Sequence, residues 1–184
     1  MELVDPHQRF HRSYLSAVEE CLEAGEEERQ VGLFSWPAQG TFPGVEFTVA
    51  SVRTSGGFSA LVDFLRGQRE DSTPRPRAYV PFTELWMADG DTYLGRISLR
   101  HELNEMLFEW GGHVGYWVRP SARNQGHATV ALRSMLELCG ERGIDPVLVT
   151  CDVDNAPSRR TIESAGGVYE DTRIGKLRYW IPAP

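Results

Sequence analysis

The stretch that most constrains the fold of this chain is residues 113–164, where two apolar segments flank one amphipathic helical pattern. Residues 114–118 form a strand pattern that ends ahead of Pro120. A continuous apolar run at 147–151 predicts a second, fully buried strand. Between them lies an apolar stripe of helical period, which predicts one buried helix face ending at Gly143: Ala128, Ala131, Leu132, Met135, Leu136 and Cys139. Two strands joined by a helix form a βαβ unit, so we expect a locally parallel sheet with a right-handed crossover.

The loop that opens this helix has the composition of an anion site. Backbone N–H groups in a first helical turn lack intrahelical partners and carry the positive end of the helix dipole. Gly126 has no side chain, Ala128 is small, and Arg123 adds a guanidinium. These features predict a phosphate or pyrophosphate site at residues 124–129. The alternative is that Gly126 only eases a tight turn and Arg123 is a solvated charge.

The pattern Arg123-x-x-Gly126-x-Ala128 resembles the acetyl-coenzyme A loop of the GNAT acetyltransferase superfamily, which also follows a strand and opens a helix. The resemblance continues at Asn155-Ala-Pro-Ser158 and at residues 163–167. It implies an α+β, three-layer fold with a mixed central sheet and flanking helices. It also implies acetyl-CoA as co-substrate and no metal.

The same resemblance implies a set of cofactor-binding residues. The backbone of Tyr116 and Val118 would pair with the pantetheine arm, and Asn155, with Ser158 beyond it, would lie near the sulfur. Residues 123–129 would hold the pyrophosphate: Arg123, Asn124, Gln125, Gly126, His127, Ala128 and Thr129. One departure matters, because many relatives carry a proton-donating Tyr seven residues after the Asn, and this chain has Ile162 there.

Composition limits the classes of partner and compartment. With 184 residues, 41% of them hydrophobic, the chain can bury one sizeable core, and we expect a single domain over residues 1–184. A net charge of −7 disfavours nucleic acid and anionic membrane as partners. Three widely spaced cysteines, Cys21, Cys139 and Cys151, indicate neither a disulfide framework nor a metal site. No export signal or long apolar run is evident, so we expect a cytoplasmic protein. A homodimer is compatible with the sequence.

Outside the central stretch the pattern is read as two helices, two hairpins and several loops. Helices are expected at 9–24 and 58–67, and hairpins at 80–99, turning at Asp89-Gly90, and at 168–181. Residues 33–44 are read as an aromatic-bearing loop whose Phe34, Trp36 and Phe42 either wall an acceptor pocket or pack onto the core. Residues 103–107 suit a short helical turn, and Gly111-Gly112 predicts a bulge ahead of the cofactor strand.

Acetyl transfer to an amine requires a neutral nucleophile, a polarised thioester carbonyl and a proton for the departing thiolate. The resemblance places the Tyr116 amide at the carbonyl. Candidate bases are Glu109, His113, and His101 with its neighbour Glu102. The alternative for each is a surface charge or a structural hydrogen bond. Local options for the acid are Tyr116, Ser158 and Cys151, with solvent water as the alternative.

Two functions follow from this reading. The first is an N-acetyltransferase that moves an acetyl group from acetyl-CoA to a small-molecule or protein amine by direct transfer in a ternary complex. The second is an acyl-CoA-binding sensor of the same fold without turnover, suggested by Ile162. A nucleotide-binding domain is disfavoured because no Gly-Lys-Ser/Thr follows the glycine loop. Arg100 indicates either a carboxylate on the acceptor or a structural ion pair. Asn155, besides its implied contact with the coenzyme, is also a candidate helix cap.

Overall fold

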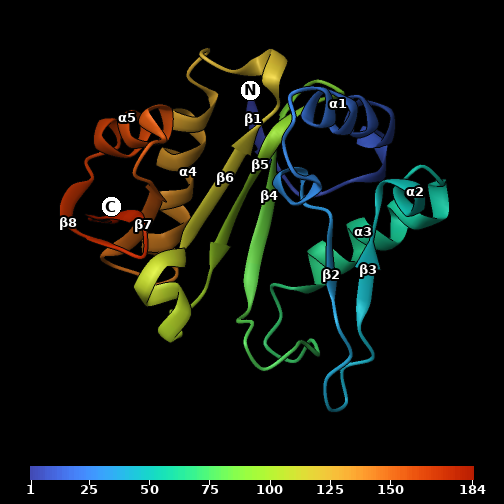
Figure 1. The fold of residues 1–184 in the computed structure, drawn as a ribbon, viewed down its shortest axis with the longest axis horizontal. Coiled ribbons are helices and arrows are strands. Elements are labelled where there is room, and N and C mark those ends of the chain that lie inside the picture. Colours follow the sequence, from blue (N-terminus) through green and yellow to red (C-terminus); the bar gives the residue numbers. More distant parts are fainter.

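The computed structural model describes residues 1–184 as one seven-stranded sheet with helices on both faces, accompanied by a small two-stranded sheet (Figure 1). In spatial order the strands are β1 (Glu2–Val4), β4 (Phe82–Asp89), β5 (Thr92–Arg100), β6 (Val114–Val118), β7 (Val147–Asp152), β9 (Lys176–Ile181) and β8 (Val168–Arg173). Only β6 and β7 pair in parallel. The predicted α+β fold with a mixed central sheet is confirmed. We retain one domain over residues 1–184 as a prediction, since strands from both ends of the chain share this sheet.

The helices divide between the two faces of the sheet, as Figure 1 shows. They are α1 (His11–Glu23), α2 (Val49–Val52), α3 (Ser55–Gly67), α4 (His127–Glu141) and α5 (Ala156–Ser164). One core cluster joins α1 and α3 to Trp86, Tyr93 and Trp117 of the sheet. The other joins α4 and α5 to strand residues that include Val114 and Val149. The period-2 alternation of each strand therefore sends its side chains into two separate cores.

Most predicted elements are present within a few residues of their expected bounds, and the parallel pairing of the βαβ unit is confirmed. The prediction of a loop at 33–44 is wrong, because β2 (Phe34–Trp36) and β3 (Val45–Phe47) pair there as a hairpin. Its aromatic rings pack against one another and against Phe64 of α3. Core packing, and not a pocket wall, is therefore what the structure shows for this segment.

The predicted bulge at Gly111-Gly112 is also absent, since β5 and β6 pair without a register shift. Gly112 has φ +66°, and a Cβ there would lie 2.8 Å from the carbonyl oxygen of Leu148. The glycine thus allows the chain to pass close to β7 as it enters β6. This crossing follows a π-helical turn, η3 (Leu107–Gly111), which begins at the last residue of the helical turn expected at 103–107.

The feature that positions the site is the separation of β6 from β7. Their register contains a single pair, Val114 with Val149, whereas β5 pairs with β6 along all of residues 114–118. Beyond Val114 the β7-facing edge of β6 therefore has no strand partner. The two parallel strands open like a V towards the carboxyl end of β6, where the loop to α4 begins.

Candidate active site

A groove of about 670 Å³ lies between the open edge of β6, the loop before α4 and the start of α5. It brings together most of the predicted cofactor-binding residues: Tyr116, Val118, Arg123, Asn124, Gly126, His127, Ala128, Thr129, Asn155 and Ser158. Gln125 does not line it, because its amide donates to the Ser121 carbonyl at 3.2 Å. Apart from Gln125, the residues that the resemblance implies therefore share one cavity, while their roles in binding remain a prediction.

Hydrogen bonding by alternate residues decides which backbone groups of β6 face this groove. The N–H of Arg100 bonds to the carbonyl of His113, and the N–H of Arg119 bonds to that of Leu94, so odd-numbered residues of this segment bond to β5. The N–H and C=O groups of Tyr116 and Val118 consequently point into the opening. An extended ligand could pair with this edge as an additional strand would.

The loop before α4 presents unpaired N–H groups at the other end of the groove. Gly126, the cap of α4, has φ +81°, and Asn124 has φ +60°. The first helical bond runs from the N–H of Val130 to the carbonyl of Gly126. The N–H groups of residues 127–129 therefore have no protein acceptor and carry the positive end of the α4 dipole, as expected of an anion site.

Arg123 is not the free cation that the loop sequence suggests. Its Nη1 lies 2.6 Å from Glu26 Oε1, its Nη2 donates to Glu26 Oε2 at 2.8 Å, and its Nε donates to the Val118 carbonyl. The indole of Trp117 donates to the same carboxylate at 2.8 Å. The Arg123 guanidinium holds the pKa of Glu26 below its usual value. A carboxylate thus stands at the mouth of the proposed phosphate site.

Glu26 and a second lining residue, Arg160 on α5, were missed by the sequence reasoning. Glu26 lies 97 positions before its partner Arg123 and sits in an acidic run that resembles a solvated turn. No spacing signal connects such distant residues. Arg160 lies beside Arg159 on α5, and sequence alone does not tell which of the two faces the groove.

Tyr116 reaches across the opening to α5. Its hydroxyl lies 2.6 Å from Ser158 Oγ, and burial raises its pKa to about 12, so the hydroxyl is protonated at neutral pH. Asn155 caps α5, since its Oδ1 accepts the N–H of Ser158 at 3.0 Å. Ile162, at the position of the usual tyrosine, is fully buried. The groove therefore contains a tyrosine hydroxyl that enters from β6 and not from α5.

Three of the four candidate bases, His113, His101 and Glu109, have other partners in the structure. His113 is buried and its Nδ1 accepts the N–H of Leu148 at 2.9 Å, so this nitrogen is already occupied. Burial, with the nearby charge of Arg100, lowers the pKa of His113 to about 4. His113 acts as a bridge at the apex of the V, where it bonds β6 to β7.

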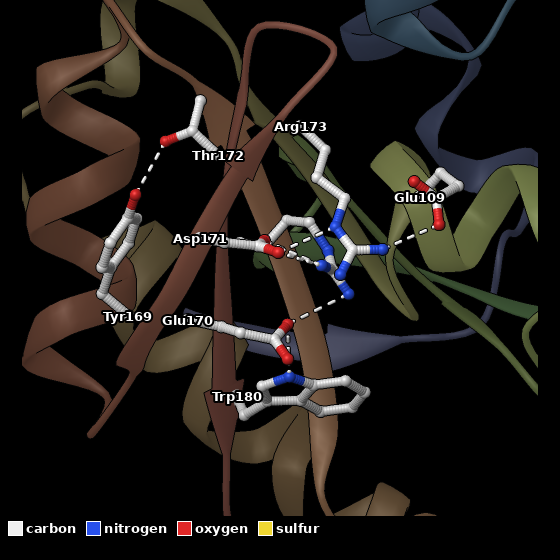
Figure 2. A network of polar contacts seen from close by, with 8 residues as sticks. Glu109, Tyr169, Glu170, Asp171, Thr172, Arg173 and Trp180 are labelled. Carbon is white, nitrogen blue, oxygen red and sulfur yellow. Dashed lines mark hydrogen bonds and ion pairs between the residues drawn. The ribbon is translucent and has the colours of Figure 1, made fainter.

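His101 and Glu109 lie outside the groove and have partners of their own. His101 Nε2 lies 2.9 Å from the hydroxyl of Thr83, and burial and Arg142 lower its pKa to about 4. Glu109, on η3, accepts a hydrogen bond from Arg173 at 2.8 Å, within the network of Figure 2. Histidines with such low pKa values are neutral at pH 7 and hold a proton only weakly.

Two further properties complete the description. No three or more His, Cys, Asp or Glu side chains come together as a set that could hold a metal ion. None of the helices combines the length and the apolar character that a membrane crossing requires.

Comparison with known proteins identifies the family. Residues 64–168, more than half of the chain, match the family model described as an acetyltransferase (GNAT) domain. Comparison with curated protein sequences finds no match. Solved structures share the fold at low identity.

Three of these structures cover nearly the whole chain. RimJ of Mycobacterium smegmatis, in complex with CoA-disulfide, is 16% identical over 98% of this chain and 81% of its own, with a TM-score of 0.64. The microcin C7 self-immunity acetyltransferase MccE, with acetyl-CoA and AMP, is 14% identical over 98% and 91%, with a TM-score of 0.61. The ribosomal L7/L12 alpha-N-protein acetyltransferase RimL, with coenzyme A, is 15% identical over 100% and 95%, with a TM-score of 0.60. With the family match over the βαβ unit and the V-shaped opening in the sheet, this chain belongs to the GNAT acetyltransferase family.

Proposed function

We propose that this protein is an N-acetyltransferase that moves the acetyl group of acetyl-CoA directly to an amine. The observation that carries the proposal is the continuity of one groove. It runs from the backbone edge of Tyr116 and Val118, which has no strand partner, to the free N–H groups of residues 127–129. A pantetheine arm fits the strand edge, and a pyrophosphate fits the helix start. RimJ, MccE and RimL, which share the fold, were each solved with coenzyme A or a derivative of it.

In this proposal the protein supplies three groups to the transfer. The Tyr116 N–H, which faces the opening, would hold the thioester oxygen as negative charge develops on it during amine attack. The new C–N bond forms as the C–S bond breaks. The Tyr116 hydroxyl would donate its proton to the departing thiolate and regain one from solvent, while Ser158 orients that hydroxyl from 2.6 Å. The amine loses its proton to water.

The partners and low pKa values of His101 and His113, and the ion pair of Glu109, bear on the acceptor. Holding a lysine-like amine of pKa about 10.4 neutral at pH 7 costs about 4.6 kcal/mol, whereas an α-amine of pKa about 8 costs about 1.4 kcal/mol. His101 and His113 are poor proton acceptors in this setting, and Glu109 is paired with Arg173. We therefore propose an α-amine, or an amine of similarly low pKa, as the acceptor. RimL, whose name records an alpha-N-protein activity, has the same fold.

The test is release of free CoA from acetyl-CoA with a panel of α-amines and matched ε-amines. We expect release with α-amines and a rate at least tenfold lower with ε-amines at pH 7. Acetyl-CoA binding without release for any amine would instead favour the sensor function. Longer acyl-CoAs in the same panel would define the acyl preference.

A further inference from the structure

Arg100, the last residue of β5, extends its guanidinium over the strand that carries the proposed reaction. A Cβ placed on Gly115 would lie 3.2 Å from both Nη1 and Nη2 of Arg100. Gly115 pairs with Ser98 of β5 and immediately precedes Tyr116. A side chain at position 115 would crowd the guanidinium, so the glycine lets it lie close to the β6 backbone.

The guanidinium lies on the opposite side of the opening from the coenzyme groove. Side chains alternate along β6, so residue 115 and Trp117 face away from the α4 and α5 core that Val114 and Tyr116 contact. The β6–β7 pairing ends at Val114, one residue before Gly115. Arg100 therefore lies beside the apex of the V, next to the Tyr116 amide that is proposed to hold the acyl oxygen.

Arg100 has no carboxylate partner. Its Nη1 donates to the carbonyls of Gly111 at 3.1 Å and Gly112 at 3.4 Å, and neither Nη2 nor Nε makes a hydrogen bond. The acid whose charge acts on Arg100 is Glu84. Glu84 has a fully buried side chain and is bound by Arg96 through both oxygens, at 2.6 and 3.1 Å. Glu84 thus balances the charge of Arg96, and the charge of Arg100 has no paired carboxylate.

The neighbouring turn η3 cannot supply the missing anion. Its one acid, Glu109, accepts a hydrogen bond from Arg173 in the network of Figure 2, where Arg173 lies between Glu109 and Asp171. The pKa of Arg100 is lowered to about 10 by burial and by Arg96, so Arg100 remains cationic at pH 7. A cation that is largely removed from water and lacks a counter-ion favours binding of an anion.

We propose that Arg100 binds a carboxylate of the acceptor, so that the substrate class is an amine carrying a nearby carboxylate. This inference rests on the proposed function for the position of the amine. The carboxylate belongs either to the main chain, as in a free amino acid, or to a side chain near a peptide N-terminus. A guanidinium with free Nη2 and Nε groups can meet a carboxylate through two parallel hydrogen bonds.

The test measures binding of matched probes to the protein saturated with CoA, using calorimetry. One arm compares α-amino acids with their C-terminal amides. The other compares amidated peptides that have Asp or Asn as the second residue. In at least one arm we expect the carboxylate member to bind at least tenfold more tightly, and Arg100→Gln to reduce that ratio below about twofold. Arg66→Gln, at an exposed arginine of α3, should retain it.

Equal affinities in both arms, including no measurable binding of either member, would overturn the proposal, as would a preference that survives Arg100→Gln. If that variant fails to fold, Arg100→Lys retains the charge and removes the planar pair of donors. It should reduce the preference at least threefold, and an unchanged preference would overturn the proposal. CoA release is measured separately. A carboxylate preference without CoA release would contradict only the proposed function, and CoA release without the preference would contradict only this inference.

Discussion

The two sides of the β6–β7 opening differ in the groups that line them, backbone on one side and charged side chains on the other. On the α4 and α5 side, the groove is formed mainly by backbone: the free edge of Tyr116 and Val118 and the N–H groups of residues 127–129. On the other side, long charged side chains dominate: Arg96 is paired with Glu84, and Arg100 binds only backbone carbonyls. A site made of backbone groups is kept when side chains are substituted, so it suits a ligand common to a whole family. A site made of side chains can be altered by a single substitution, so it suits a ligand that differs between members. We infer that the first side binds the coenzyme and that the second selects the acceptor.

Substitution of Tyr116 should have the largest effect on catalysis, because its amide and hydroxyl both face the opening. We expect Tyr116→Phe to lower kcat about a hundredfold, or about 2.7 kcal/mol, through loss of the proton donor, with little change in acetyl-CoA affinity. Steady-state kinetics and calorimetric titration would measure the two effects. Tyr169→Phe, which removes an exposed hydroxyl bonded to Thr172, is the control. Wild-type kcat in Tyr116→Phe would leave protonation to water.

His113 bonds β6 to β7 at the closed end of the opening, so protonation of its ring should weaken this contact. Its folded pKa of about 4 lies below the ordinary 6.5, and the unfolded chain therefore binds more protons between these values. Stability should fall by about 2 kcal/mol as the pH drops from 6.5 to 4.5. His113→Asn keeps an acceptor for the Leu148 N–H and does not titrate.

The measurement for His113 is chemical denaturation across this pH range. The variant should lose about 2 kcal/mol less than the wild type, and the difference isolates His113 from His101, which titrates in the same direction. Parallel curves would show that His113 does not link pH to the β6–β7 contact.

Gly126 tests the backbone side alone. We expect Gly126→Val to weaken acetyl-CoA binding more than about tenfold, or 1.4 kcal/mol, because the side chain blocks the approach to the N–H groups. Gly126 has φ +81°, so the substitution also strains the loop. Gly143→Val is a matched control, since Gly143 has φ +71°, no neighbour within 4 Å of an added Cβ, and no place in the groove. An unchanged dissociation constant in folded Gly126→Val would reject the coenzyme site.

The smallest expected effect concerns Glu26, whose carboxylate lines the coenzyme groove beside Arg123. Glu26→Gln should tighten acetyl-CoA binding about threefold, because it releases Arg123 and removes a negative charge, while Gln still accepts from Trp117. Arg123→Ala should weaken binding by a similar factor. Both effects should shrink in high salt. Weaker binding in Glu26→Gln would mean that Glu26 mainly positions Arg123.

The sequence predicts the backbone side far better than the charged side. The strand at 114–118, the helix after Gly126 and the cap at Asn155 are each encoded by a few adjacent residues, and the structure places them as expected. The short β2–β3 hairpin was not predicted, because three-residue strands between Pro and Gly residues carry almost no period.

The charged groups depend on contacts that no local pattern records. Histidine type alone suggests a base, yet burial and the charge of Arg100 lower the pKa of His113. Its Nδ1 is also occupied by the N–H of Leu148, which lies 35 positions away. Glu26 and Arg123 are similarly far apart in sequence. Tertiary packing fixes both, so a single sequence could propose candidates for the acceptor side but could not choose among them.

The cysteines bear on how the activity can be followed. Cys21, Cys139 and Cys151 are all free and at most 5% exposed, and burial raises the pKa of each thiol. Reagents that detect thiols react with the accessible thiolate form, so the folded protein should be nearly silent towards them. A colorimetric thiol reagent added to the reaction would then report coenzyme release alone. On unfolding, the same reagent would register three new thiols per chain, which makes one dye an indicator of both turnover and loss of the native state.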